Sequence, residues 1–276
     1  MMDFINLVTK EALRRGYSLK TIRAYVQCVR QFFRTCHKDP KSVTKKDIKS
    51  YIDILISRRA SGNTINVHIN ALKFLLEDIL GKKVLLRIRH PKTPKRLPVV
   101  LTKQEIIKLL DSVENPKHAL VLKLMYSSGL RLSELVHLKR KDLELEKNLG
   151  WVRGGKGGKD RVFIIAEKIK GGLRQHIESN CDSPDSWIFK GNKGRHLSQR
   201  SVQEIIRSAA RKAGIFKNVH PHTLRHSFAT HLIEDGYDLA SVQFLLGHTS
   251  IQTTMIYVHM SSPKMINVKS PLDSLQ

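Results

Sequence analysis

Residues 128–135 read Ser-Gly-Leu-Arg-Leu-Ser-Glu-Leu, and residues 222–230 read His-Thr-Leu-Arg-His-Ser-Phe-Ala-Thr. Arg131 stands at a helix start directly after Gly-Leu, among apolar residues that predict partial burial of its side chain. Arg225 lies three residues after His222, so the guanidinium and the imidazole share one helix face. An arginine after a turn is usually a surface or capping residue, so neither stretch is informative alone. The two stretches become informative only in combination with motifs elsewhere in the chain.

Two further places combine unusual residues with unusual positions. The stretch 154–160, Gly-Gly-Lys-Gly-Gly-Lys-Asp, separates two short β patterns at 151–153 and 161–165 and predicts a hairpin turn. A lysine at such a tip can reach outward on its flexible stem. Further on, Leu246-Gly247-His248 is followed nine residues after the histidine by Tyr257. A single tyrosine on an apolar face is usually a core residue.

The rest of the pattern is helical. In the first part, apolar residues at helical spacing predict segments at about 3–14, 18–35, 44–55 and 63–80. In the second part, helical patterns lie at about 102–110, 119–126, 198–213, 222–235, 239–246 and 251–258, and the pattern after the hairpin returns to helix beyond Gly171-Gly172. Capping boxes at Thr44–Asp47 and Thr102–Glu105 mark two of the helix starts. The fold class is therefore mainly α with a small β-hairpin or sheet.

The charge of the chain predicts a polyanionic partner. Its 276 residues include 49 Lys and Arg against 24 Asp and Glu, a formal net charge of +25. Residues 1–96 hold 22 of these cations against 7 carboxylates, a net +15, while residues 97–276 hold 27 against 17, a net +10. So large an excess on the helices of the first part favours contact with a DNA backbone over a merely solvated surface.

A proline-rich basic stretch separates the two parts. Three prolines between Arg87 and Pro98 lack the amide donor of a helix and push the preceding residues out of the α region. A surface loop within one domain is the alternative. We expect an interdomain linker over residues 87–101, because the length of the chain suits two domains.

Membrane and metal sites are disfavoured. No apolar run approaches the roughly 18 residues of a spanning helix, and the N-terminus lacks the layout of a signal peptide. The three cysteines form no CxxC motif, which disfavours a disulfide scaffold or a cysteine zinc site. His222 and His226 could share a zinc-ligand face, but no H-E-x-x-H motif is present and Arg225 would repel a metal ion. We therefore expect a soluble, cytoplasmic protein with no metal and no membrane partner.

Taken in chain order, these stretches resemble the tyrosine recombinase (phage-integrase-like) family. The resemblance covers residues 102–258 and includes both arginine stretches, the hairpin lysine, Leu246-Gly247-His248 and Tyr257. Lys159 also lies in the hairpin turn, but Lys156 has the Gly-Lys-Gly setting typical of the family. The short helical first part is similar to the core-binding domain of these enzymes. The compact size is most like the Xer-type recombinases, which resolve circular chromosome dimers.

The chemistry of strand cleavage fits the residues that carry the resemblance. A tyrosine hydroxyl, with an ordinary pKa of about 10, must lose its proton to attack a phosphodiester. Tyr257 is the expected nucleophile and forms a covalent 3′-phosphotyrosine. Arg131 and Arg225 offer the fork geometry that clamps the non-bridging oxygens of the transition state.

The other polar residues supply proton transfer and phosphate contacts. Lys156 is the expected general acid for the departing 5′-oxygen, His222 a general base or phosphate ligand, and His248 a hydrogen-bond donor to the phosphate. Because the arginines supply the positive charge and the phosphotyrosine retains the bond energy, neither a divalent ion nor a nucleotide is needed, and no cofactor is expected.

The resemblance also implies a domain organisation and partners. We expect a helical core-binding domain over residues 1–86, a linker over 87–101, a mixed α/β catalytic domain over 102–261 and a C-terminal tail over 262–276. Five apolar residues in the tail suggest docking on a neighbouring protomer in place of a frayed end. The expected partner is double-stranded DNA with an inverted-repeat-like site, bound by a homotetramer on two sites.

The resulting function is site-specific DNA recombination that resolves circular chromosome or plasmid dimers. One alternative is a phage or mobile-element integrase of the same family. A type IB topoisomerase-like enzyme is disfavoured by the small first part, and a catalytically silent DNA-binding module is disfavoured by the presence of all six polar residues. The DNA sequence that the protein recognises does not follow from the amino-acid sequence.

Overall fold

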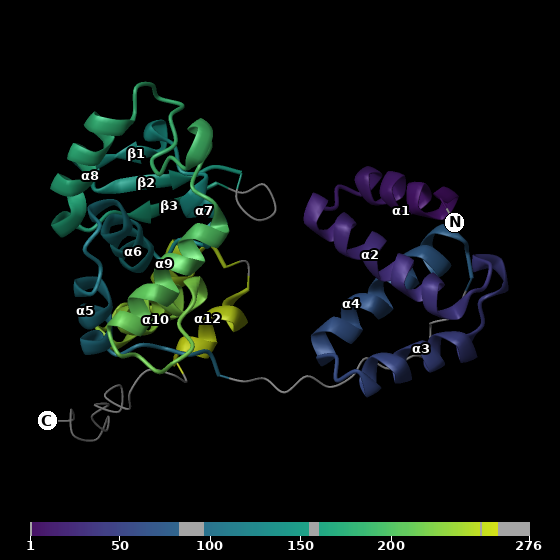
Figure 1. The fold of residues 1–276 in the computed structure, drawn as a ribbon. Coiled ribbons are helices and arrows are strands. Elements are labelled where there is room, and N and C mark those ends of the chain that lie inside the picture. The colour runs from purple at the N-terminus through teal and green to yellow at the C-terminus, as the bar shows by residue number, and fades with distance from the viewer. Residues whose placement is uncertain (1, 83–96, 155–159, 249, 259–276) are drawn as a thin grey trace, which may run out of the picture. The chain divides into compact units, whose positions relative to one another are not determined.

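The computed structural model describes residues 2–82, 97–154, 160–248 and 250–258. The chain forms two compact units, Met1–Arg96 and Leu97–Gln276 (Figure 1). Lys156, Lys159, most of the predicted linker and the predicted tail lie outside the described residues.

The N-terminal unit is entirely helical in its described part. Its elements are α1 (Met2–Arg14), α2 (Leu19–Cys36), η1 (Pro40–Ser42), α3 (Lys45–Ser57), α4 (Gly62–Lys73) and η2 (Phe74–Ile79). The predicted cap of α2 is confirmed, because the Ser18 hydroxyl accepts a hydrogen bond from the amide of Thr21 at 3.1 Å. The predicted capping box of Thr44 and Asp47 is confirmed as well. These local contacts determine where α2 and α3 begin.

The last predicted helix of this unit consists of an α-helix followed by a π-helical segment. Residues 63–80 are helical as predicted, but Phe74–Ile79 form a π-helical segment that continues α4. Phe74, Leu75 and Leu76 are all buried. The π-helical segment is therefore part of the core of the unit.

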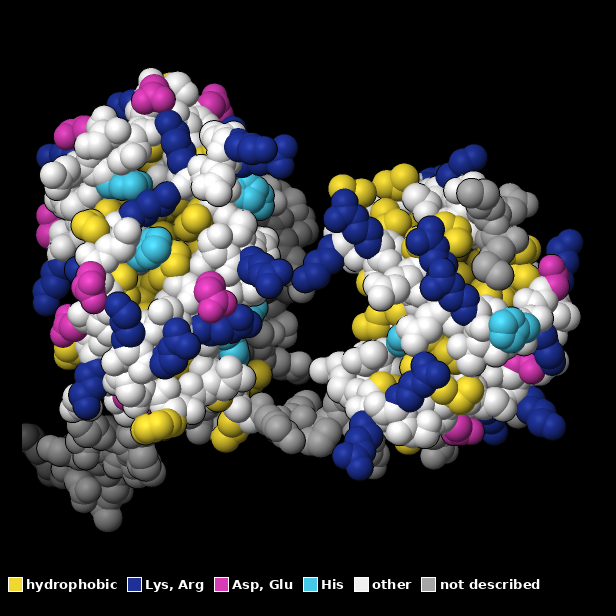
Figure 2. Space-filling view, in the orientation of Figure 1, with side chains coloured by type: hydrophobic (Ala, Val, Ile, Leu, Met, Phe, Trp, Pro, Cys, Tyr) yellow, Lys and Arg dark blue, Asp and Glu magenta, His cyan; other side chains and the backbone are white. Residues whose placement is uncertain are grey.

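Basic side chains lie along the exposed face of α2. Arg23, Arg30 and Arg34 are exposed and recur at helical spacing. Figure 2 shows Lys and Arg side chains spread over this view of the N-terminal unit, with fewer Asp and Glu among them. The charge excess predicted from the sequence is therefore presented on the surface of the folded unit.

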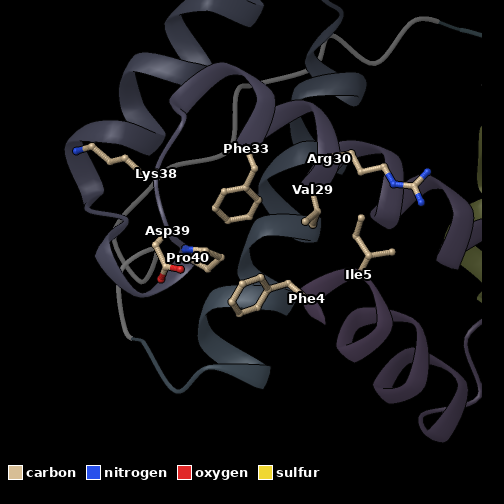
Figure 3. A pocket seen from close by; sticks show the side chains of 8 residues that line it. All are labelled: Phe4, Ile5, Val29, Arg30, Phe33, Lys38, Asp39 and Pro40. Carbon is tan, nitrogen blue, oxygen red and sulfur yellow. The ribbon is translucent and has the colours of Figure 1, made fainter. Parts of the chain in front are cut away.

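A small pocket of the N-terminal unit lies beside these helices (Figure 3). Its lining is mainly apolar and comprises Phe4, Ile5, Val29, Arg30, Phe33, Lys38, Asp39 and Pro40. It contains none of the residues predicted to take part in catalysis.

The second unit combines helices with a small sheet. Its helices are α5 (Lys103–Asp111), α6 (Pro116–Ser128), α7 (Leu132–Val136), α8 (Glu167–Asn180), α9 (Gln199–Lys212), α10 (Pro221–Glu234), α11 (Leu239–Leu246) and α12 (Ile251–Val258), with short 3-10 turns η3 (Arg140–Asp142), η4 (Leu145–Lys147) and η5 (Asn192–Gly194). The strands β1 (Leu143–Glu144), β2 (Leu149–Val152) and β3 (Arg161–Ile164) form an antiparallel sheet in the order β1-β2-β3. In Figure 1 the sheet lies toward one end of the unit and α10 and α12 toward the other.

One strand of this unit was not predicted, and one predicted helix start is wrong. The strand β1 was not predicted, because two residues are too few to show a β period. Helix α8 begins at Glu167 and includes Gly171 and Gly172, whereas the sequence predicted helix only beyond them. Burial of Ile169, Leu173 and Ile177 along one face stabilises α8 despite the helix-weakening glycines. The β-hairpin, the buried α6 and the capping box of Thr102 and Glu105 are confirmed.

Two further features of the described residues concern membrane spans and cysteines. No helix among them is long and apolar enough to cross a membrane. Cys28, Cys36 and Cys181 are all free thiols. The architecture is mainly helical with one small sheet, as predicted.

Candidate active site

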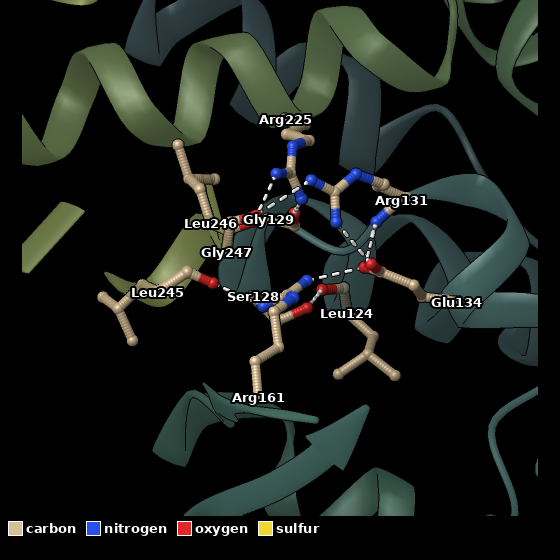
Figure 4. A network of polar contacts seen from close by, with 10 residues as sticks. All are labelled: Leu124, Ser128, Gly129, Arg131, Glu134, Arg161, Arg225, Leu245, Leu246 and Gly247. Atoms are coloured by element: carbon tan, nitrogen blue, oxygen red, sulfur yellow. Dashed lines mark hydrogen bonds and ion pairs between the residues drawn. The ribbon is translucent and has the colours of Figure 1, made fainter. Parts of the chain in front are cut away.

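Arg225 is a buried arginine held by the ends of two other helices. Its side chain lies on α10, and the residue is only 3% exposed. Its Nη1 donates to the carbonyl of Gly129 at 2.6 Å, and its Nη2 donates to the carbonyl of Leu246 at 2.5 Å (Figure 4). These carbonyls lie at the C-terminal ends of α6 and α11, where helix carbonyls lack intrahelical partners and carry partial negative charge. The guanidinium therefore links three helices.

The turn after α6 requires glycine. Gly129 has φ +58°, and a Cβ built there would lie 2.4 Å from Cδ1 of Phe228 on α10. A side chain would thus meet both an unfavourable backbone conformation and a packed aromatic ring. Because Gly129 ends α6 and precedes α7 by only two residues, this turn also positions Arg131, the residue that caps the start of α7.

Arg131 and Arg161 share one carboxylate. Glu134 Oε1 accepts from Nη1 of Arg131 at 2.7 Å, and its Oε2 accepts from Nη2 of Arg161 at 2.6 Å. The side chains of Glu134 and Arg161 are 6% and 8% exposed, whereas that of Arg131 is 22% exposed, as its predicted partial burial requires. Arg131 Nη2 also reaches the carbonyl of Gly247 at 3.3 Å, and Arg161 donates to the carbonyl of Leu245. Figure 4 shows Arg131 and Arg225 converging on the end of α11.

The site carries more positive than negative charge. Arg131, Arg161 and Arg225 lie together around the carboxylate of Glu134. Burial, and then the charges of Arg131 and Arg161, lower the pKa of Arg225 to about 9, so it is still cationic at neutral pH. Burial alone would raise the pKa of Glu134, but Arg161 and Arg131 hold it below its ordinary value. Such an excess of buried guanidinium charge is suited to an anion.

Tyr257 lies in the same region, on α12. It is 2% exposed and packs in an apolar cluster with Phe228, Val242 and Leu246. Burial raises the pKa of its phenol, while the nearby charges of Arg225 and Arg131 act in the opposite direction. Its hydroxyl is 3.0 Å from Nδ1 of His226. The predicted nucleophile is therefore protonated and covered in this structure.

His248 also packs against the phenol. Its ring stacks on that of Tyr257 with centroids 6.2 Å apart and an interplanar angle of 17°. Its Nδ1 is 2.9 Å from the hydroxyl of Thr254. Burial, and then the charges of Arg225 and Arg131, lower the pKa of His248 to about 4. When the Thr254 hydroxyl donates to Nδ1, the neutral ring carries its proton on Nε2 and can donate it to an anion.

His222, predicted as a general base or phosphate ligand, lies at the surface of the unit. It belongs to the first turn of α10 and is exposed, and its ring centroid is 6.1 Å from that of His226. Burial of part of the ring, followed by the charges of His220, Arg225 and Arg131, lowers its pKa. The ring nitrogen within hydrogen-bond distance of the phenol hydroxyl is Nδ1 of His226. The sixth predicted residue, Lys156, lies outside the described residues.

Sequence reasoning did not assign a role to three residues of this network. Glu134 was visible in the quoted stretch as a carboxylate three residues after Arg131, a spacing that brings the two side chains together at a helix start. Arg161 opens β3, and only the packing of β3 against α11 reveals that it is buried. His226 was considered only as a zinc ligand. Among the described residues, no group of three His, Cys, Asp or Glu side chains could hold a metal ion.

The chain matches known families over most of its length. Residues 99–263 match the phage integrase family, and residues 4–85 match the phage integrase N-terminal SAM-like domain. The chain is a tyrosine recombinase of the phage integrase family. This membership agrees with the arginine pair and the buried tyrosine of the second unit, and it identifies the protein as a site-specific recombinase that transfers DNA strands.

Individual relatives of this tyrosine recombinase agree with the family match. It is 37% identical to the tyrosine recombinase XerA of Pyrococcus horikoshii over 251 residues, which cover 90% of this chain and 85% of the relative. It is 33% identical to an integrase/recombinase of Escherichia coli, with 94% and 90% covered. Among solved structures, the XerH site-specific recombinase bound to difH substrate is 25% identical, with a TM-score of 0.73 and coverage of 92% of this chain and 80% of that one. The expected recombinase fold is thereby confirmed.

Proposed function

We propose that this recombinase cleaves DNA by attack of the Tyr257 hydroxyl on a phosphate held by Arg131, Arg225, His222 and His248. The observation that carries the proposal is the convergence of two guanidiniums beside one buried tyrosine, with excess positive charge around them. The arginines are fixed by helix-end carbonyls before DNA arrives, so little reorganisation is needed when charge develops on the phosphate. The product is a covalent 3′-phosphotyrosine.

The two histidines and Lys156 have the remaining roles in the proposed reaction. His222, in the first turn of α10, acts as a phosphate ligand, since it is exposed at the positive end of that helix. His248 donates from Nε2 to a phosphate oxygen. Lys156, which lies between β2 and β3 in the sequence, protonates the 5′-oxygen as it leaves. The charge of the arginines takes the place of a divalent ion in this scheme.

The organisation of the chain is part of the proposal. Residues 1–86 act as the core-binding domain, 87–101 as the linker, 102–261 as the catalytic domain and 262–276 as a tail that docks on a neighbouring protomer. The exposed arginines of α2 support DNA contact by the first of these. Four protomers on two inverted-repeat-like sites would then exchange strands in the cytoplasm.

We further propose that the cellular role is the resolution of circular chromosome or plasmid dimers. The names of the Xer relatives support this role, and the solved XerH relative is bound to a difH substrate. Integration of a mobile element is the alternative, since the Escherichia coli relative is named an integrase/recombinase. A plasmid with two directly repeated sites separates strand exchange from simple relaxation, because a recombinase converts it into two circles.

The substitution Tyr257→Phe tests the nucleophile. We expect the variant to lose all covalent DNA adduct on denaturing gels while its DNA affinity stays within a few-fold of wild type, because affinity comes mainly from backbone charges. Tyr237, an exposed tyrosine of the same unit, provides the matched control Tyr237→Phe, which keeps full adduct formation. An adduct formed by the Tyr257→Phe protein would remove Tyr257 from this role.

A further inference from the structure

His226 is the residue in direct contact with the reacting oxygen. Its Nδ1 lies 3.0 Å from the Tyr257 hydroxyl, and the two ring centroids are 5.6 Å apart. The side chain projects from α10 one residue after Arg225, so the helix that supplies the buried guanidinium also supplies the ring against the phenol. A contact of this length is a hydrogen bond, and its direction depends on which ring nitrogen carries the proton.

The rings around His226 form a row that leads outward from the buried phenol. Successive centroids lie 5.6 Å apart for Tyr257 and His226, 6.1 Å for His226 and His222, and 6.2 Å for His222 and His220. His226 is half-buried, whereas His222 and His220 are exposed. A proton taken up by His226 therefore has imidazoles between it and solvent.

We propose that His226 is a further catalytic residue, which accepts the phenolic proton of Tyr257 during strand cleavage. The inference rests on the proposed function, in which Tyr257 is the nucleophile. As the Tyr257 oxygen forms its bond to phosphorus, its proton moves to Nδ1 of His226 and the bond between phosphorus and the 5′-oxygen breaks. The 5′-oxygen takes a proton from the general acid. On religation the steps reverse, and the imidazolium returns its proton to the phenol.

The protonation states of the free protein agree with this role. Burial, and then the neighbouring His222, His220 and Arg225, lower the pKa of His226 to about 4, so its ring is neutral at pH 7 and has a nitrogen free to accept. Burial raises the pKa of Tyr257, so the proton stays on the phenol while the site is empty. A phosphate bound to Arg225 adds negative charge near both groups and favours protonation of His226. Proton transfer is thereby coupled to the presence of DNA.

The test compares covalent adduct formation by wild type, His226→Gln and His226→Asn from pH 7 to pH 9. The substrate is a nicked duplex carrying the sequence recovered from DNA covalently attached to the wild-type protein in cells. Without an acceptor, attack must wait for the phenolate, whose population rises about tenfold per pH unit below the phenol pKa. We expect both variants to be slower by roughly 10²-fold at pH 7 and to gain rate with pH more steeply than wild type, at unchanged DNA affinity.

A second histidine–tyrosine pair on the same helix provides the control. His231 Nδ1 lies 2.9 Å from the Tyr126 hydroxyl, so His231→Gln removes an equivalent contact from α10 outside the reaction. We expect it to lower the melting temperature about as much as His226→Gln while leaving the adduct rate and its pH dependence unchanged. His226 variants within about threefold of wild type, or slower with a parallel pH profile, would overturn the proposal.

A measurement on the unmodified side chain covers the case in which the variants do not fold. In ¹⁵N-histidine spectra of the wild-type protein we expect Nδ1 of His226 to be unprotonated and its signal to move in Tyr257→Phe. A protonated Nδ1 would show that His226 donates to the phenol, which is incompatible with the proposal. Failure of Tyr257 as nucleophile is a separate outcome, seen as adduct formation by Tyr257→Phe.

Discussion

Replacing Glu134 by glutamine tests whether the buried arginines depend on their shared carboxylate. The Glu134 side chain is 6% exposed and accepts hydrogen bonds from Arg131 Nη1 at 2.7 Å, from Arg161 Nη2 at 2.6 Å and from the Arg131 amide at 2.8 Å. Glutamine keeps the shape of the side chain and one acceptor oxygen. It removes the negative charge and turns one acceptor into a donor that faces a guanidinium.

The expected cost follows from the burial of the network. Removing one partner of a buried ion pair typically destabilises a protein by roughly 3–5 kcal/mol, because the other charge is left uncompensated. The oxygen that glutamine retains places this case near the lower end, at about 3 kcal/mol. For a unit of this size each kcal/mol shifts the melting temperature by about 2–4 °C, so we expect a decrease of about 6–12 °C at pH 7.

The stabilisation by the Glu134 carboxylate should depend on pH in a defined direction. Since its arginine partners hold the pKa of Glu134 below its ordinary value, the ionised carboxylate stabilises the fold. This stabilisation is fully present above the carboxyl pKa of the unfolded chain and is lost as the pH falls through the lower pKa of the folded state. The difference in unfolding free energy between wild type and Glu134→Gln should therefore be constant near neutrality and shrink in acid.

The assay is thermal unfolding followed by circular dichroism, with Glu204→Gln as the matched control. Glu204 lies on α9, and its side chain is 68% exposed in a surface pair with Arg207. Its loss should change stability by less than about 1 kcal/mol. Equal melting temperatures for the two variants, or a Glu134→Gln difference that persists unchanged in acid, would refute the argument that the carboxylate compensates buried charge.

Three further predictions concern the arginine clamp, the turn after α6 and the tail. Arg225→Lys and Arg131→Lys keep the charge but lose the planar bidentate fork of the guanidinium, so single-turnover cleavage should fall by roughly 10²-fold or more in each. Near-normal cleavage by either variant would exclude that residue from the site. Gly129→Ala should destabilise the fold by about 1–3 kcal/mol in denaturant titrations, because alanine is strained at φ +58° and its Cβ would overlap Phe228, and an unchanged unfolding midpoint would contradict this. Deletion of residues 262–276 should preserve half-site binding but impair tetramer assembly, measured by light scattering, and reduce the yield of product circles, measured on gels. A truncated protein that recombines normally would show that the tail is only a frayed end.

Features encoded within a few residues were predictable from the sequence. The capping boxes at Thr44 and Thr102 join residues three apart, so each helix start follows from the local side chains. The antiparallel pairing of β2 with β3 follows from two short β patterns with a glycine-rich sequence between them. The helix α8 was misplaced for the opposite reason, since the tertiary packing of its apolar face, which local propensity does not report, outweighs two glycines.

The sequence by itself determined which side chains are available for the chemistry, namely the two arginines, the histidines and Tyr257, because their types and order match strand cleavage by a tyrosine. Only the tertiary structure decided how they are partnered. Arg225 donates a hydrogen bond to the carbonyl of Gly129, 96 residues away, Arg161 pairs with Glu134, and the Tyr257 hydroxyl lies 3.0 Å from Nδ1 of His226. These contacts depend on how α6, α10, α11 and α12 pack, and helical spacing within one segment carries no information about which residue of another segment a side chain meets.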